Sequence, residues 1–162
     1  MYRLLCLFFV FVSGVASAST IHLSPSLKIN GYRGAEMQLG LTDIWSFDAV
    51  YLNYGESWNK TNRYDERARH YRVGLQHKFE RAPHNGFQAE IGVASYSGKK
   101  YSSSSVDAKE SLGLSLAGAY VYQINSNIGV RSGVDYSIFS QQNTHFYSDS
   151  LLSINLGVLI RF

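Results

Sequence analysis

The chain has 162 residues, with 15 Lys and Arg, 12 Asp and Glu and a formal net charge of +3 at pH 7. This length suits one domain, and a small charge spread over both signs excludes the basic footprint of a nucleic-acid-binding protein. Aromatic residues and Gly are plentiful, whereas Pro and charged residues are few, which excludes a disordered chain and favours β-strands.

The first 18 residues are typical of an export signal. Arg3 supplies a positive start, an apolar run follows, and Ala16-Ser17-Ala18 offers small residues for cleavage. We therefore expect a signal peptide at 1–18 and a single mature domain at 19–162. Cys6 is the only cysteine and lies in the segment to be removed, so the mature protein is expected to have no disulfide. An exported domain without disulfides is typical of a bacterial envelope.

From residue 21 onwards, apolar and polar residues alternate with a period of two, which predicts β-strands. Alternate side chains of a strand point to opposite faces, so each strand has one apolar face and one small or polar face. In the segment 46–57 either face fits, because Val50 and Leu52 alternate with Ala49 and Tyr51. The pattern predicts eight strands of about 10 to 13 residues each. The alternating residues that identify them occupy 21–30, 34–41, 46–57, 71–79, 87–94, 111–123, 127–138 and 152–162.

The connections between these strands are expected to alternate in length. Short turns are predicted at 43–45, 81–85 and 124–126, and longer polar loops at 58–68, 98–109 and 140–149, with a tight exception at 30–32. Short turns on one rim and longer loops on the other are typical of a membrane β-barrel. An even number of strands places both chain ends at the short-turn rim.

The alternation by itself leaves open which face lines the barrel. A soluble lipocalin-like barrel turns its apolar face inward around a small ligand. Small and oppositely charged residues on the polar face instead suit a narrow, filled interior, and aromatic residues near the strand ends suit two membrane interfaces. The sequence therefore predicts an all-β fold, an eight-stranded antiparallel up-and-down transmembrane β-barrel.

The last predicted strand carries the most specific pattern, alternate apolar residues that end on an aromatic one: Leu156, Val158, Ile160 and Phe162. This pattern resembles the C-terminal signal of outer-membrane barrels, which the barrel-assembly machinery recognises. The size and strand number resemble the small OmpX/Ail-type and OmpA-barrel proteins. The resemblance implies a bacterial outer-membrane location, with outer-membrane lipid, lipopolysaccharide and the assembly machinery as partners.

The polar face of the predicted barrel carries charges of both signs. These charges are expected to pair, because an unpaired charge in a narrow interior is costly. We expect two linked ion clusters and a solid polar core, with a narrow channel or proton path as the alternative. The predicted lumen ion network comprises Lys28, Glu36, Arg72, Glu90, Arg131, Asp135 and Arg161, with Lys78 as a further cation.

Catalysis has little support in the sequence. His22 near the inner rim and His70 at the outer edge have ordinary positions, and no two histidines show metal-ligand spacing. The enzymatic alternative resembles the outer-membrane lipid A deacylases of the PagL type, with His145 as base beside Ser148 and Asp149. We expect no catalytic residue, no metal site and no cofactor.

The predicted outer loops offer an interaction surface. Lys99, Lys100 and Tyr101 are expected to contact lipopolysaccharide phosphates or a host or matrix surface. A solvated loop that only keeps the rim soluble is the simpler interpretation. The sequence thus predicts a non-enzymatic, monomeric envelope protein with a structural or surface-interaction role and no nucleic-acid partner.

Overall fold

The structure of the chain is a computed structural model that describes residues 20–30, 32–44, 46–103, 105–145 and 150–162. The expected signal peptide at 1–18 therefore lies outside the described residues. Within them, no helix is long and apolar enough to cross a membrane. The helical turn η1 (Gln141–Asn143) is a short 3-10 segment.

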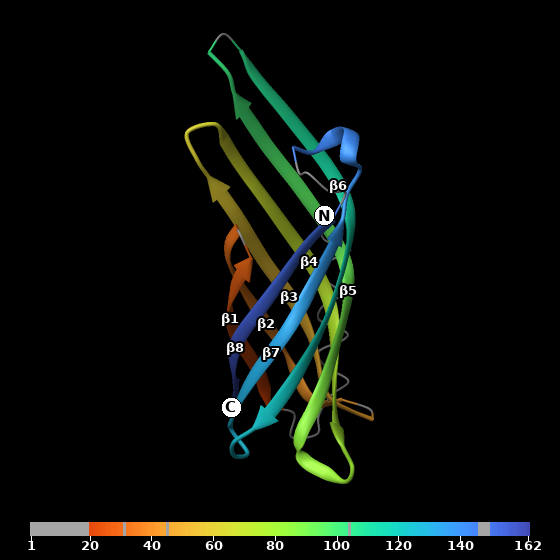
Figure 1. The fold of residues 1–162 in the computed structure, drawn as a ribbon. Helices are drawn as coiled ribbons and strands as arrows, with labels where there is room; N and C mark the ends of the chain where they lie inside the picture. The colour runs from red at the N-terminus through yellow and green to blue at the C-terminus, as the bar shows by residue number, and fades with distance from the viewer. Residues whose placement is uncertain (1–19, 31, 45, 104, 146–149) are drawn as a thin grey trace, which may run out of the picture.

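The described residues form one closed antiparallel barrel, in which each strand pairs with its neighbours in the sequence (Figure 1). Pairing of β1 with β8 closes the barrel, with Leu27 opposite Leu156 and His22 opposite Arg161. The predicted strand number and up-and-down order are confirmed. The strands are β1 (Ile21–Asn30), β2 (Tyr32–Ile44), β3 (Phe47–Lys60), β4 (Tyr64–Phe79), β5 (Ala82–Tyr101), β6 (Val106–Gln123), β7 (Ile128–Ile138) and β8 (Ser150–Arg161).

The barrel is polar inside and apolar outside. Arg72 and Glu90 point inward and are at most 5% exposed, whereas Ile91 on the outer face is 59% exposed. Burying such an outer face in an apolar medium is favourable by about 25 cal/mol per Å². The lipocalin-like alternative is therefore wrong, because the apolar face points away from the lumen.

Strand β3 had an undecided orientation in the sequence, and its register decides it. Leu52 lies between Leu39 of β2 and Val73 of β4, and all three side chains point outward. Tyr51 and Asn53 consequently point into the lumen, where both are almost fully buried.

Four strands are longer than predicted. β3, β4, β5 and β6 have 14, 16, 20 and 18 residues. The predicted loops at 58–68 and 98–109 are therefore mostly strand, and the connections shrink to 61–63 and 102–105. Alternation continues through these polar segments, and charged residues face each other across the ladder, as with Lys60 opposite Asp65. This cross-strand pairing explains why polar residues that suggested loops form strands.

The extra length projects from one end of the barrel. Figure 1 shows the β3–β4 and β5–β6 hairpins rising beyond the neighbouring strands. Pairing of β6 with β7 stops at Leu114 and Ile138, so residues 106–113 of β6 lie beyond the closed ring. We call the parts of β3–β6 that extend past the last β6–β7 pair, Leu114 and Ile138, the projecting sheet. The end of the barrel from which they project is called the hairpin end.

The opposite end, here the short-turn end, holds the start of β1 and the end of β8. Ile21 and Phe162 exchange two backbone hydrogen bonds there. The turn predicted at 124–126 is confirmed after β6, whereas Asp43 and Ile44 of the turn predicted at 43–45 still belong to β2, and residue 45 lies outside the described residues. The predicted turn at 81–85 is shorter than expected, because β5 already begins at Ala82.

Candidate functional site

The middle of the lumen holds a single buried ion network with Arg72 of β4 at its centre. Its guanidinium contacts three carboxylates, Glu36 at 2.9 Å, Glu90 at 2.7 Å and Asp135 at 2.8 Å. The Arg72 side chain is fully buried, and its partners are at most 3% exposed. One cation thus bridges acids from strands β2, β5 and β7.

Two further cations complete the network. Lys28 Nζ lies 2.6 Å from Asp135 and 3.5 Å from Glu36, and Arg131 lies 2.9 Å from Glu36 and 3.7 Å from Glu90. The three cations and three acids balance, so the network carries no net charge. The two linked clusters expected from the sequence form one continuous network, because the long Arg72 side chain joins groups that strand counting had placed at different depths.

Neutral side chains add hydrogen bonds to the carboxylates. Glu90 accepts hydrogen bonds from the side chains of Gln38 and Asn53, each at 2.6 Å. Asn155 donates to Asp135 at 3.1 Å, and Ser26 donates to Glu36 at 2.9 Å. A buried ion pair is tolerated when its atoms are fully hydrogen-bonded, so these polar residues belong to the same unit.

His70 is part of this network, although the sequence had suggested a position at the outer edge. Its Nδ1 lies 3.2 Å from Lys28 Nζ, and its Nε2 lies 2.9 Å from Arg72 Nη2. Gly55 provides the space, because a Cβ there would lie 2.2 Å from the imidazole ring. The missed signal was the inward alternation of Arg72 and Gln76, which continues through β4 to His70.

Arg161 lies apart from the other six predicted members. It belongs to the end of β8, opposite His22, and it forms no ion pair among the described residues. Asp48 and Asp43, near the short-turn end, are carboxylates whose charges act on it. Lys78 also lies near this end, where it pairs with Asp48 at 2.9 Å.

Polar and aromatic residues fill the lumen on the short-turn side of the ion network. His22 stacks on Tyr51 with ring centroids 4.9 Å apart, and Gln88 donates to Gln76 at 2.9 Å. Gly74 makes room for the Tyr51 ring, since a Cβ at that position would lie 2.3 Å from it. His22 is therefore a buried lumen residue rather than a rim residue.

A further buried carboxylate lies on the hairpin side of the network. Glu66 accepts hydrogen bonds from Tyr32 at 2.6 Å and from Tyr96 at 2.8 Å. Phe139 packs against Tyr96, and the backbone N–H of His145 donates to the Tyr96 hydroxyl at 3.1 Å. The segment that follows β7 thus folds over the lumen at this end.

The hydrolase alternative depended on His145, Ser148 and Asp149. His145 Nε2 lies 3.2 Å from the backbone oxygen of Asp107, and the ring contacts Tyr64. Ser148 and Asp149 lie outside the described residues, so the proposed pairing remains a prediction. Among the described residues, no group of three or more His, Cys, Asp or Glu side chains is arranged to hold a metal ion.

The remaining predicted site residues lie on strands, except Phe162, which directly follows β8. Leu156, Val158 and Phe162 point outward at the end of the chain and are 43–65% exposed, and Ile160 shares their strand face. Lys99, Lys100 and Tyr101, which the sequence had placed in a loop, belong to the exposed end of β5 in the projecting sheet.

Comparisons with known proteins identify the fold. A major outer-membrane protein of Thermus thermophilus superposes with a TM-score of 0.66 at 12% identity, covering 90% of this chain and 100% of that one. Ail of Yersinia pestis gives 0.64 at 13% identity, covering 89% and 97%. Neisserial surface protein A gives 0.62 at 14% identity, covering 90% and 98%. No protein-family model matches the sequence, and neither does any curated protein sequence.

The chain therefore has the fold of the small eight-stranded outer-membrane β-barrels, as its sequence predicted. At these identities the similarity is one of architecture. The residues of the lumen and of the projecting sheet have to be interpreted from their own geometry.

Proposed function

We propose that this protein is a non-enzymatic outer-membrane barrel with a sealed lumen, and that its projecting sheet is an interaction surface outside the membrane. The observation that carries the proposal is the continuation of β3–β6 beyond the closed ring. These strands keep their ladder hydrogen bonds and expose charged residues in place of the apolar belt. Membrane barrels bear their longer extensions on the extracellular side, which supports this orientation.

The sealed lumen is supported by the neutral ion network. Arg72, Glu36 and Glu90 have side chains that are 0–1% exposed and that meet across the barrel interior. Eight-stranded barrels have an interior that side chains can fill. A permeating ion would have to displace paired charges from this layer, which is the physical reason for preferring a plug to the narrow-channel alternative.

The surface-interaction role follows from the position of Lys99, Lys100 and Tyr101 near the tip of the projecting sheet. An ordered sheet presents side chains with less loss of conformational entropy on binding than a flexible loop does. Ail, which shares the fold, has been crystallised with the heparin analogue sucrose octasulfate. A sulfated glycan matrix is therefore a suitable first probe for an external partner of this protein.

The test is a shortened hairpin in the full chain, expressed on bacteria. Ser97 and Glu110 face each other across β5 and β6, so residues 98–109 can be replaced by Asn-Gly, which favours a two-residue hairpin turn. We expect the variant to keep the heat-dependent gel mobility of a folded barrel and to lose binding of the cells to immobilised heparin and to host-cell matrix.

A point variant separates the surface chemistry from the hairpin length. Lys99→Gln, Lys100→Gln and Tyr101→Ala together should weaken binding without affecting gel mobility, whereas Arg81→Gln near the short-turn end should leave binding unchanged. Undiminished binding by the folded, shortened variant would eliminate the interaction role.

A further inference from the structure

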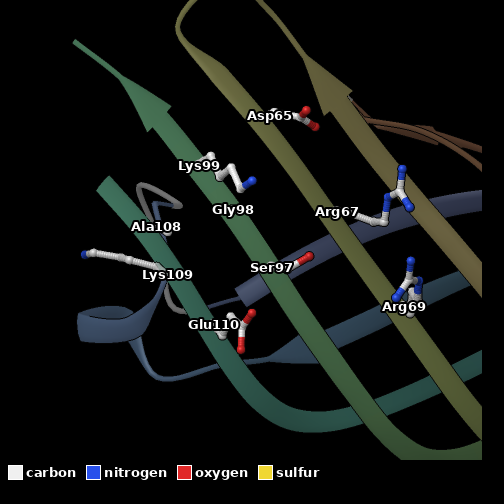
Figure 2. Close-up of a pocket in the computed structure, with 9 residues that line it drawn as sticks. All are labelled: Asp65, Arg67, Arg69, Ser97, Gly98, Lys99, Ala108, Lys109 and Glu110. Carbon is white, nitrogen blue, oxygen red and sulfur yellow. The ribbon is translucent and has the colours of Figure 1, made fainter. Parts of the chain in front are cut away.

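A pocket lies on the outer face of the projecting sheet, close to the apolar belt of the barrel. Its volume is about 220 Å³, and Figure 2 shows side chains from β4, β5 and β6 gathered around it. Four cations and two acids are among its lining residues, but the ammonium of Lys109 donates to the backbone oxygen of Thr144 at 3.1 Å, so Arg67, Arg69 and Lys99 are the cations that face the pocket. The charged lining residues are Arg67, Arg69, Lys99, Lys109, Asp65 and Glu110.

The position of this pocket along β4 relates it to the membrane surface. Tyr71 is the last outward aromatic residue of the belt on β4, and Arg69 and Arg67 are the next two outward residues. At about 3.4 Å per residue they lie roughly 7 and 14 Å further along the strand. A strand tilt of about 40° reduces these distances to roughly 5 and 10 Å along the membrane normal. The polar headgroup layer is about 5–8 Å thick on each side, so both guanidiniums can reach it.

The two arginines are held in place by a shared carboxylate. Glu56 of β3 lies 2.8 Å from Arg67 Nε and 3.6 Å from Arg69 Nε. The Tyr54 hydroxyl donates to Glu56 at 3.2 Å, and the Tyr54 ring lies 5.1 Å from that of Tyr71. The cluster is thus attached directly to the aromatic residues of the belt.

Glu56 contacts both arginines at Nε, so it offsets one of their two charges and no ion pair with the remaining guanidinium nitrogens is found among the described residues. The side chains of Arg67 and Arg69 are 49% and 40% exposed, whereas that of Glu56 is 24% exposed. Guanidinium groups bind phosphate through paired, charge-assisted hydrogen bonds, and Lys99 adds a further cation on the neighbouring strand.

We propose that Arg67, Arg69 and Lys99 form a binding site for the phosphate groups of a phosphorylated glycolipid in the outer leaflet of the same membrane. The inference rests on the membrane insertion in the proposed function and does not need the external partner. Arg69 and Arg67 face sideways, directly beyond the lipid-facing Tyr71, whereas Lys99 lies closer to the end of β5. This position favours a lipid headgroup over a free phosphate compound, which would share the same chemistry.

The experiment measures lipid binding by the full chain in nanodiscs of zwitterionic lipid. The probes are bisphosphorylated lipid A, the same lipid without phosphates, and inorganic pyrophosphate. The test variant is Arg67→Gln/Arg69→Gln. The control is Lys60→Gln/Arg63→Gln, which removes the same charge from the tip of the β3–β4 hairpin, where neither residue lines the pocket.

We expect the affinity for bisphosphorylated lipid A to fall about tenfold or more in the test variant, since two charge-assisted contacts are lost, and to change less than twofold in the control. Wild-type protein should bind the phosphate-free lipid as weakly as the test variant binds the phosphorylated one. The site would be overturned if wild type and test variant bound bisphosphorylated lipid A with equal affinity. It would also be overturned if wild type bound the phosphorylated and the phosphate-free lipid equally well. Pyrophosphate binding as tight as lipid binding would overturn the lipid as its ligand.

Heat-dependent gel mobility of each nanodisc sample separates this inference from the proposed function. Folded, inserted protein without a phosphate preference would overturn the lipid site alone. Wild-type protein that does not insert would overturn the outer-membrane assignment on which the site depends.

Discussion

Removing the central cation of the lumen should destabilise the barrel more than any surface change. Replacement of Arg72 by Gln leaves Glu36, Glu90 and Asp135 with only Lys28 and Arg131, so the buried network acquires one net negative charge. Breaking a buried pair by removing one partner costs about 3–5 kcal/mol. We expect a loss of this size in the free energy of unfolding.

A second substitution provides the internal test. The double variant Arg72→Gln/Glu90→Gln has two cations and two acids, so the network is again neutral. Its loss in the free energy of unfolding should be smaller, by at least about 2 kcal/mol, than the summed losses of the two single variants. The assay is reversible urea unfolding in lipid vesicles, followed by tryptophan fluorescence. Arg33→Gln is the control, because Arg33 is exposed and its loss should change stability by less than about 0.5 kcal/mol. If the loss in the double variant equals the sum of the losses in the two single variants, the reasoning that charge balance stabilises the lumen is refuted.

Further predictions concern packing, permeability and topology. Gly74→Ala should lower stability by about 1–3 kcal/mol in the same unfolding assay, because its Cβ would meet the Tyr51 ring; an unchanged midpoint would contradict the lumen packing. Purified wild-type protein in a planar bilayer should show no steady large conductance, and a stable open level would refute the sealed lumen. Cysteine introduced at Leu156 in native vesicles should resist water-soluble maleimides, since this side chain faces lipid; labelling as fast as an exposed loop would contradict the orientation. Deletion of Phe162 should slow assembly of the folded form in cells, measured by pulse labelling and gel mobility, and an unchanged rate would remove its role as an assembly signal.

The sequence predicted the barrel because every strand must place polar side chains in the lumen and apolar side chains on the outer face. On β8, for example, Ser153 and Asn155 point into the lumen, whereas Ile154 and Leu156 point outward. This period-two signal needs no knowledge of partner strands. It also identified most of the lumen charges, since any charged residue on the polar face of a closed barrel points inward.

The limits of the prediction have equally specific causes. Polarity marked 58–68 and 98–109 as loops, but strands that leave the membrane lose their apolar face while keeping their hydrogen bonds. The role of His70 depended on the true start of β4 at Tyr64, which only the pairing with β3 and β5 reveals. The merger of two expected clusters into one required the reach of Arg72, a three-dimensional distance that strand counting does not contain.

The ion network also links sealing to stability. In a barrel surrounded by lipid, outward side chains gain little free energy from contacting each other instead of lipid. Contacts that connect distant strands are therefore made by side chains in the lumen. Lys28, Glu36, Arg72, Glu90 and Asp135 connect five of the eight strands through charges that are satisfied only together. An opening wide enough for a hydrated ion would separate these pairs and leave their desolvated atoms without partners. The same groups that close the lumen therefore hold the barrel together, and a conducting variant of this protein is expected to be a less stable one.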